Sequence, residues 1–198
     1  MAADIGRIAR DLTGFYDFSG KDVVYVGAGG GRLLDAVKSA RRLQAVDQDA
    51  AALEQLRQAA ARMGLATPLT LTAGDYAGTS LKGDVVYFEF CLHEMPDPAT
   101  ALGRALSSAP EVVVLDHLPD SPWVVLTGET GKAAASWAAL ARLPARRQER
   151  FEGVQAFKDY EDIRSKLAVL GPAALERIEP FRARKDFQVL MPYGAVLL

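Results

Sequence analysis

The stretch Val23-Val-Tyr-Val-Gly-Ala-Gly-Gly-Gly-Arg-Leu-Leu-Asp35 joins a short apolar run to four glycines within five positions. The apolar run predicts a buried strand, and residues 32–40 predict a helix. A strand that turns through glycines into a helix leaves backbone N–H groups bare and lets a ligand approach closely. The next apolar segment ends on Asp47, an acid placed to accept hydrogen bonds from a ribose diol.

The glycine pattern distinguishes between two kinds of nucleotide-binding turn. A dinucleotide fingerprint has the form G-x-G-x-x-G/A. Counted from Gly27, its last position is Arg32, whose long side chain should obstruct close packing of helix on strand. Counted from Gly29, the last position is Leu34. The stretch instead contains G-x-G-x-G, which ends at Gly31, and a turn with a purely structural purpose remains the alternative.

Length and composition are those of a globular protein with one domain. The chain has 198 residues, a net charge of −2 and a pI near 5.7, so we expect no general attraction to nucleic acid. Cys91 is the only cysteine, which excludes an intramolecular disulfide and a cysteine-rich metal site, and no metal is expected. No signal peptide and no apolar run of about 18 residues is found, so we expect a cytoplasmic protein without a membrane span.

Predicted strands alternate with predicted helices five times through residue 115. This alternation is typical of right-handed βαβ units in an open, mostly parallel sheet. Such sheets bind ligands beyond the carboxyl ends of their strands. A chemically distinctive residue follows each of the five strands: Gly27, Asp47, Asp75, the segment 90–94, and Asp116.

The last third of the chain predicts helices over residues 131–143 and 160–170. Residues 175–182 and 187–198 are interpreted as two strands joined by a short polar link, which indicates an antiparallel hairpin at the edge of the sheet. At the other end, residues 3–14 predict an amphipathic helix. We therefore divide the chain into an N-terminal helix and link, residues 1–19, which packs on the core or acts as a lid, and a main domain, residues 20–198.

Four motifs together resemble those of the class I S-adenosylmethionine (SAM) dependent methyltransferases that act on small molecules. They are the G-x-G-x-G loop, Asp47, the triplet Gly74-Asp75-Tyr76, and residues 86–98, whose Leu92-His-Glu-Met-Pro-Asp-Pro98 follows the family form Leu-His-x-x-x-Asp-Pro. The resemblance covers roughly residues 20–198. It implies a Rossmann-like α/β fold, with a seven-stranded, mostly parallel sheet of order 3-2-1-4-5-7-6 that ends in an antiparallel C-terminal hairpin.

The resemblance also implies a cofactor site for SAM, with S-adenosylhomocysteine (SAH) as the product. Gly27, Gly29 and Gly31 match the loop under the methionine part of SAM. Asp47 matches the acid that binds the ribose hydroxyls, with Gln48 beside the adenine. Further cofactor contacts are expected from Asp75, which matches the acid for the adenine amino group, from Tyr76 beside the ring, and from Glu89 and Phe90 at the end of the fourth strand.

One position departs from the family pattern. The family has an acid two residues before the first motif glycine, where it meets the SAM amino group, and this chain has Tyr25. Glu89 on the adjacent strand is a candidate to replace that acid. Without a replacement, the loss of one hydrogen bond to a charged group would weaken SAM binding about ten- to a hundredfold.

Three residues at the ligand edge are candidates for a general base, namely His93, Glu94 and His117. A histidine can accept a proton near neutral pH, although a base is needed only if the acceptor loses a proton. The structural alternative is that His93 and His117 pack and form local hydrogen bonds, with Asp116 capping the following turn. We expect methyl transfer to a small-molecule acceptor, and the alternative is a non-catalytic protein that binds SAM or a nucleoside and acts through a partner.

Overall fold

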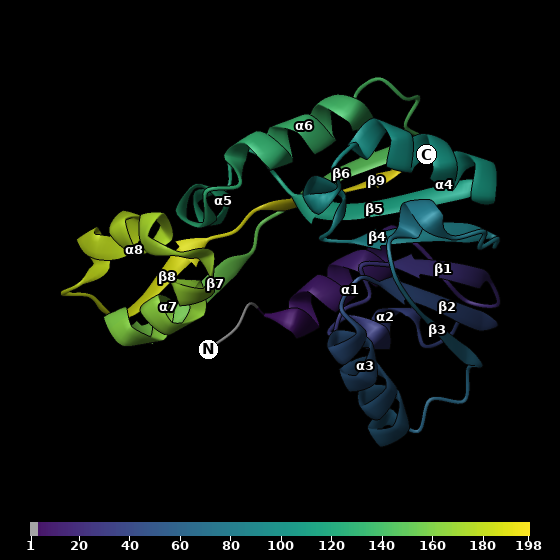
Figure 1. Cartoon of the computed structure of the whole chain (residues 1–198), viewed down its shortest axis with the longest axis horizontal. Helices are drawn as coiled ribbons and strands as arrows, with labels where there is room; N and C mark the ends of the chain where they lie inside the picture. The colour runs from purple at the N-terminus through teal and green to yellow at the C-terminus, as the bar shows by residue number, and fades with distance from the viewer. Residues whose placement is uncertain (1–3) are drawn as a thin grey trace.

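A computed structural model describes residues 4–198 and has a seven-stranded sheet at its centre (Figure 1). The strand order is β3-β2-β1-β4-β5-β9-β6, with the first five strands parallel and β9 antiparallel to both β5 and β6. The predicted order is confirmed, because β9 takes the place of the seventh strand. The strands of this sheet are β1 Asp22–Val26, β2 Arg42–Asp47, β3 Leu69–Ala73, β4 Val85–Glu89, β5 Glu111–His117, β6 Arg147–Phe151 and β9 Tyr193–Leu197.

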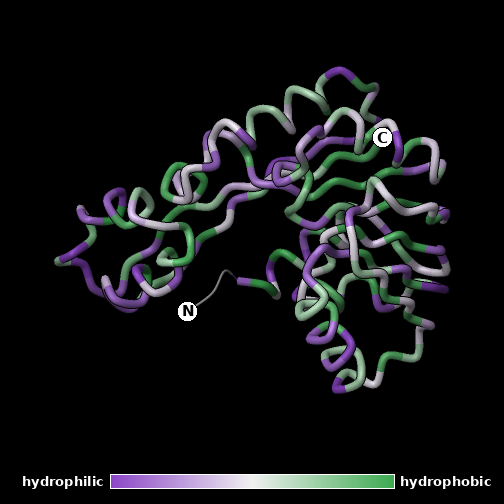
Figure 2. Tube along the Cα trace, viewed as in Figure 1, coloured by the Kyte–Doolittle hydropathy of each residue, from purple (hydrophilic) through white to green (hydrophobic). Residues whose placement is uncertain are grey.

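The central strands are buried on both faces, which explains their nearly continuous apolar sequence. Alternate side chains point to opposite faces: Val23 and Tyr25 join one apolar cluster, and Val24 and Val26 join the other. The hydrophobic residues accordingly gather along the middle of the sheet (Figure 2).

Helices cover both faces of the sheet (Figure 1). The first face carries α1 Ile5–Phe15, α2 Leu34–Val37 and α3 Ala50–Met63, and the second carries α4 Pro98–Ser108 and α6 Thr130–Leu140. Of the helix predicted over residues 32–40, only α2 is α-helical, because hydrogen bonds between residues three apart form tight turns around it. No helix within residues 4–198 is long and apolar enough to cross a membrane.

The C-terminal region corrects the prediction for residues 175–182, which are not a strand. Pro172 begins helix α8 Pro172–Ile178, and its buried residues Ala174 and Ile178 are four positions apart, as a helix requires. A second short turn, Glu179–Phe181, contains Pro180. The first strand of the terminal antiparallel pair is therefore β6, which comes earlier in the chain than predicted.

Residues 152–192 form a lobe inserted between the two paired strands β6 and β9. The lobe contains the antiparallel pair β7 Val154–Asp159 and β8 Lys185–Leu190, with α7 Tyr160–Leu167, a 3₁₀ turn Ala168–Leu170, and α8. Pro192 separates β8 from β9, since proline cannot donate a hydrogen bond within a continuous strand. The lobe projects from the sheet beside helix α5 Pro122–Thr127 (Figure 1).

The N-terminal segment packs on the first face of the sheet. Ile8, Leu12 and Phe15 of α1 are buried in the same apolar cluster as β1 and β4, and that cluster continues into the lobe. Asp4 caps the helix by accepting a hydrogen bond from the backbone N–H of Arg7. Residues 1–3 of the predicted segment lie outside the described residues.

Candidate functional site

The glycine loop after β1 has the backbone geometry that the sequence pattern indicates. Gly27, Gly29 and Gly31 have φ angles of +68°, +47° and +75°, a region that side chains rarely allow. A Cβ on Gly27 would lie 2.4 Å from the Cβ of Cys91, and one on Gly31 would lie 2.5 Å from a methyl group of Leu56. At Gly29 the nearest atom would be 3.9 Å away. Gly27 and Gly29 face an open cavity, whereas Gly31 packs against α3.

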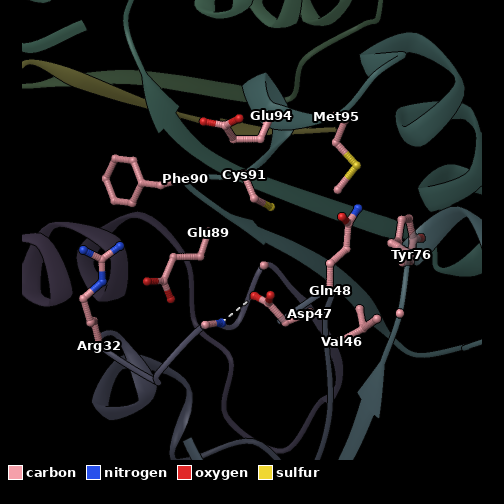
Figure 3. A pocket seen from close by; sticks show the side chains of 13 residues that line it. Arg32, Val46, Asp47, Gln48, Tyr76, Glu89, Phe90, Cys91, Glu94 and Met95 are labelled. Atoms are coloured by element: carbon pink, nitrogen blue, oxygen red, sulfur yellow. Dashed lines mark hydrogen bonds between the residues drawn. The ribbon is translucent and has the colours of Figure 1, made fainter. Parts of the chain in front are cut away.

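This first cavity has a volume of about 420 Å³ and lies beyond the carboxyl ends of β1, β2 and β4 (Figure 3). Its walls combine backbone of the glycine loop with acidic, apolar and sulfur-containing side chains. The lining residues are Gly27, Gly29, Arg32, Val46, Asp47, Gln48, Gly74, Tyr76, Glu89, Phe90, Cys91, Glu94 and Met95. The position at the strand ends is the usual ligand site of such sheets.

Asp47 is fixed at the edge of the glycine loop. One carboxylate oxygen accepts a hydrogen bond from the Gly29 N–H at 2.8 Å (Figure 3). The other carboxylate oxygen accepts from the Asp49 N–H at 2.9 Å. Each oxygen keeps a lone pair that a hydroxyl in the cavity can use. Of the other predicted cofactor residues, Gln48 and Tyr76 line the cavity.

Asp75 lies at the rim rather than in the wall. Its side chain is exposed, and it caps the short turn Tyr76–Gly78 by accepting a hydrogen bond from the Ala77 N–H at 3.0 Å. Gly74 and Tyr76 on either side do line the first cavity.

Glu89 lies directly beside the position where the family has its motif I acid. The Tyr25 hydroxyl donates a hydrogen bond to the Glu89 carboxyl group, and Glu89 is only 5% exposed. Burial raises the pKa of Glu89 well above its usual range. The next residue, Phe90, has a φ of +44°, a strained conformation for a non-glycine residue. The structure thus brings a carboxyl group to this point from β4 instead of β1.

His93 is held by Asp116 inside the protein. Its Nδ1 lies 2.5 Å from one Asp116 oxygen, and its backbone N–H donates to the other oxygen at 2.9 Å. Asp116 also accepts from the His117 N–H, so it ties the turn Leu92–Glu94 to β5 and is not simply the cap of the turn that follows. Burial alone lowers the pKa of His93, but the hydrogen bond and charge of Asp116 outweigh it, and the pKa is raised. His93 is not among the residues that line either of the two cavities described here.

Glu94 and its neighbours form a charged group at the mouth of the first cavity. Lys132 Nζ lies 2.7 Å from a Glu94 oxygen and 3.6 Å from Glu129. His93, Glu94 and Glu129 offer possible metal-ligand atoms within 4.8 Å of one another. The ammonium of Lys132 pairs with both carboxylates, so their charge is already partly neutralised.

His117 is set against a second cavity. Its Nδ1 is buried without a hydrogen-bond partner among residues 4–198, and its ring lies 4.7 Å from that of Phe90. Burial lowers the pKa of His117 to about 4, so the ring is neutral at pH 7. His117 is the member of the predicted catalytic group that lines this cavity.

The second cavity has a volume of about 150 Å³ and adjoins the first. Arg32, Glu89 and Phe90 line both cavities, so they form a shared wall. The remaining walls come from α1, the end of β5, helix α5 and the lobe. These other lining residues are Ile5, Ile8, Leu33, His117, Trp123, Gln155, Lys166 and Met191.

Several of these residues were not predicted as site residues. Arg32 stood out in the sequence only as a departure from the dinucleotide fingerprint, yet it lies between the two cavities. Trp123 belongs to none of the motifs in the sequence, and it is both buried and part of the second cavity. Lys166 and Met191 belong to the inserted lobe and carry no motif that could have identified them.

Comparisons with known proteins agree with this geometry. Residues 24–107 match a family described as a methyltransferase domain. The structure is similar to that of a proposed methyltransferase from Bacillus halodurans, with 14% identity, a TM-score of 0.69, and coverage of 98% of this chain and 97% of that one. It is also similar to magnesium protoporphyrin IX methyltransferase from Synechocystis with bound SAH, with 13% identity, a TM-score of 0.58, and coverage of 97% and 80%.

A third similar structure is that of a proposed RNA methyltransferase from Pyrococcus horikoshii, with 16% identity, a TM-score of 0.57, and coverage of 96% and 83%. No curated protein sequence matches the chain at a significant level. The glycine loop, the strand order and the cavity at the strand ends define a nucleotide-binding domain of the Rossmann-like type. Residues 24–107 thus match a methyltransferase domain, and the strand order together with the similar solved structures shows that the chain has the class I methyltransferase fold.

Proposed function

We propose that the protein transfers a methyl group from SAM to a small-molecule acceptor that binds in the second cavity. The observation that carries this proposal is the shared wall: Arg32, Glu89 and Phe90 line both the larger and the smaller cavity. A cofactor in one and an acceptor in the other would meet there. Bringing the two reactants together in this way can supply about 7–11 kcal/mol of the barrier reduction.

The first cavity supports cofactor roles for the residues that line it. Gly27 and Gly29 allow close approach to the loop, and the Asp47 oxygens have free lone pairs for the ribose hydroxyls. Gln48 and Tyr76 are the candidates for contacts with adenine. Gly31 supports the loop from behind, and Asp75 at the rim remains the proposed acceptor for the adenine amino group.

We assign the SAM amino group to Glu89. The carboxyl group is in the wall of the first cavity, and Tyr25 holds it by a hydrogen bond, so the tyrosine acts as a support for the displaced acid. A cation near a buried carboxyl group favours its ionised form. Glu89 would therefore release its proton when the charged cofactor binds.

Bound SAM supplies a methyl group on a positively charged sulfur, which leaves as a neutral thioether. The chain's own residues position the acceptor and exclude water. His117 is neutral at pH 7 and lines the second cavity, so it can accept a hydrogen bond from an acceptor hydroxyl. His93 and Glu94 remain candidates for proton transfer, with Asp116 fixing the orientation of His93.

The N-terminal segment contributes to the acceptor side. Ile5 and Ile8 of α1 form part of the wall of the second cavity. We propose that residues 4–19 close this cavity, whereas the rest of the chain carries the cofactor site and the remaining walls. A space of about 150 Å³ favours a small molecule, although the acidic net charge alone does not exclude RNA.

Calorimetric titration of the purified protein with SAM and SAH tests the proposal. Micromolar binding of either is expected, and the absence of binding up to millimolar concentration would overturn it. The acceptor class is tested by incubating the protein with SAM labelled at the methyl group, a small-molecule extract and total RNA. Label in the small-molecule fraction is the expected outcome, and label only in RNA would contradict it.

A further inference from the structure

The second cavity has the size of a single aromatic ring. A cavity of about 150 Å³ lined by apolar side chains can hold a molecule of the size of benzene. Here the rings of Phe90 and Trp123 form part of the wall, with the flexible side chain of Met191 and the aliphatic side chains of α1. Flat, polarisable walls of this kind favour a planar ring over a branched aliphatic chain.

The polar groups of the cavity carry an excess of positive charge. Lys166 donates a hydrogen bond to Gln155 at 2.6 Å and lies 5.1 Å above the Trp123 ring, but it forms no ion pair with any carboxylate of residues 4–198. Arg32 is an exposed residue at the edge of the cavity and makes no ion pair with a side chain of residues 4–198. Two cations are therefore present without an anionic partner.

The other titratable groups in the wall do not balance these cations. Glu89 is the only carboxylic acid among the lining residues that the structure describes, and its burial favours the protonated form. His117 is neutral at pH 7. Burial lowers the pKa of Lys166, the nearby charge of Arg32 adds to this effect, and the charge of Asp162 opposes it only in part. A bound anion would relieve both costs, because it replaces the solvation that Lys166 has lost and its charge offsets the repulsion between the two cations.

We propose that the acceptor is a single-ring aromatic carboxylate, whose carboxylate binds Lys166 and whose ring contacts the Phe90 and Trp123 walls. This inference rests on the proposed function, since it names the class of molecule that would be methylated. The Lys166 ammonium offers three donors, of which one is used by Gln155. The remaining donors suit a carboxylate, and the Arg32 charge on the same side adds long-range attraction.

Benzoate and benzamide are matched probes of this site, because they share a ring and differ in charge. Calorimetry on the full chain, with and without saturating SAH, should show that benzoate binds about tenfold or more tightly than benzamide. Lys166→Met should abolish this preference, and Lys166→Arg should keep most of it. Lys158→Met, at an exposed position of the same lobe, is the control and should leave the preference unchanged.

Three outcomes would overturn the inference: equal binding of the two probes, no benzoate binding up to about 10 mM, or a full preference for benzoate in Lys166→Met. If that variant does not fold, the comparison of the two probes on the unmodified chain decides alone. Benzoate preference without SAH binding would support the cavity's specificity and overturn the proposed methyl transfer. SAH binding without benzoate preference would overturn only the acceptor class.

Discussion

The two cavities share a wall but are assembled from the chain in different ways. Every residue of the first cavity lies between Gly27 and Met95, either in the last residues of a parallel strand or in the segment that follows such a strand. The second cavity draws on residues from Ile5 to Met191, including helix α5 and the inserted lobe. The first cavity, the proposed cofactor side, is therefore built by local sequence patterns, and the second cavity, the proposed acceptor side, is built by tertiary packing of distant segments.

This difference implies that the two sides can be damaged separately. A change in the glycine loop should affect both the fold and the first cavity, because the backbone of the loop itself forms part of the cavity wall. A change in the lobe should affect the second cavity while the first cavity keeps its shape. The following predictions test this separation.

The largest effect is expected for Gly27→Ala. The residue has a left-handed backbone conformation, and its new Cβ would overlap Cys91 at 2.4 Å. Strain and steric overlap together should lower the free energy of unfolding by about 3 kcal/mol or more and abolish measurable SAH binding. Urea denaturation and calorimetry would measure these two quantities.

Gly64→Ala is the matched control for this change. Gly64 has a similar φ of +64° at the end of α3, but no atom lies within 4 Å of the added Cβ. Gly64→Ala should therefore lower the free energy of unfolding by only about 1 kcal/mol and leave SAH binding unchanged. An equal loss of stability in both variants would show that contact with Cys91 does not matter.

The next effect concerns the lobe. Phe157 is 2% exposed and stacks on both Trp123 and Phe187. Phe157→Ala should therefore lower the free energy of unfolding by about 3 kcal/mol and shift the fluorescence of Trp123. SAH affinity should change by less than about twofold, because the lobe contributes no residue to the first cavity.

Phe181→Ala removes a ring from the same lobe at a less buried position. Phe181 stacks on Phe187 with ring centres 5.2 Å apart but is only partly buried, so the cost should be smaller. A large drop in SAH affinity in either variant would contradict the independence of the two sides.

A third prediction addresses the cofactor side without disturbing its fold. Asp47→Ala removes a carboxylate that contacts the glycine loop and faces the first cavity. SAH affinity should fall about ten- to a hundredfold, as expected for the loss of hydrogen bonds to a charged group. Calorimetry measures the affinity, and circular dichroism checks the fold.

Asp49→Ala is the control for this change. Asp49 caps α3 by accepting hydrogen bonds from Ala51 and Ala52, and it does not line the first cavity. It should cost about 1 kcal/mol of stability and leave SAH affinity nearly unchanged. Unchanged affinity in Asp47→Ala would mean that the cofactor site is misassigned.

Sequence patterns predicted the sheet order and the position of the first cavity because both follow local rules. Asp47 could be placed in the site from one apolar run and its end, since the carboxyl ends of parallel strands share one edge. The lobe could not be recognised, because the apolar spacing of residues 175–182 also fits a strand and only Pro172 and Pro180 signal otherwise. Lys166 could not be placed, since its neighbours in space, Trp123 and Arg32, lie far away in the sequence.

The Glu89 carboxyl group was predictable from the sequence only in part. Its position beside the glycine loop was expected from the adjacent strand, but its support by Tyr25 was not. Tyr25 and Tyr87 are neighbours on paired strands, and their rings stack at 5.2 Å within the buried face. Tyr25 therefore takes part both in the core packing, through its ring, and in holding the Glu89 carboxyl group, through its hydroxyl.

The smallest effects are expected in the pH dependence of stability, where two residues of the second cavity act in opposite directions. His117 has a pKa of about 4 in the folded protein, below its ordinary 6.5. The unfolded chain therefore binds more protons between these values, and stability falls as the pH drops through the window. Glu89 has a raised pKa in the folded protein, so above pH 4.5 the folded chain binds more protons and stability falls as the pH rises.

Between pH 4.5 and 6.5 these two contributions partly cancel, and single variants should separate them. The stability of the unmodified chain relative to His117→Gln should rise by about 2–3 kcal/mol from pH 4 to 6.5. The stability of Glu89→Gln relative to the unmodified chain should also rise with pH, because glutamine keeps the hydrogen bond from Tyr25 without the cost of a buried charge. Urea denaturation across this range measures both differences. If SAH reduces the pH dependence of the Glu89→Gln difference but not that of the His117→Gln difference, the cofactor contacts the shared wall and not His117. If SAH changes neither pH dependence, Glu89 does not bind the charged end of the cofactor.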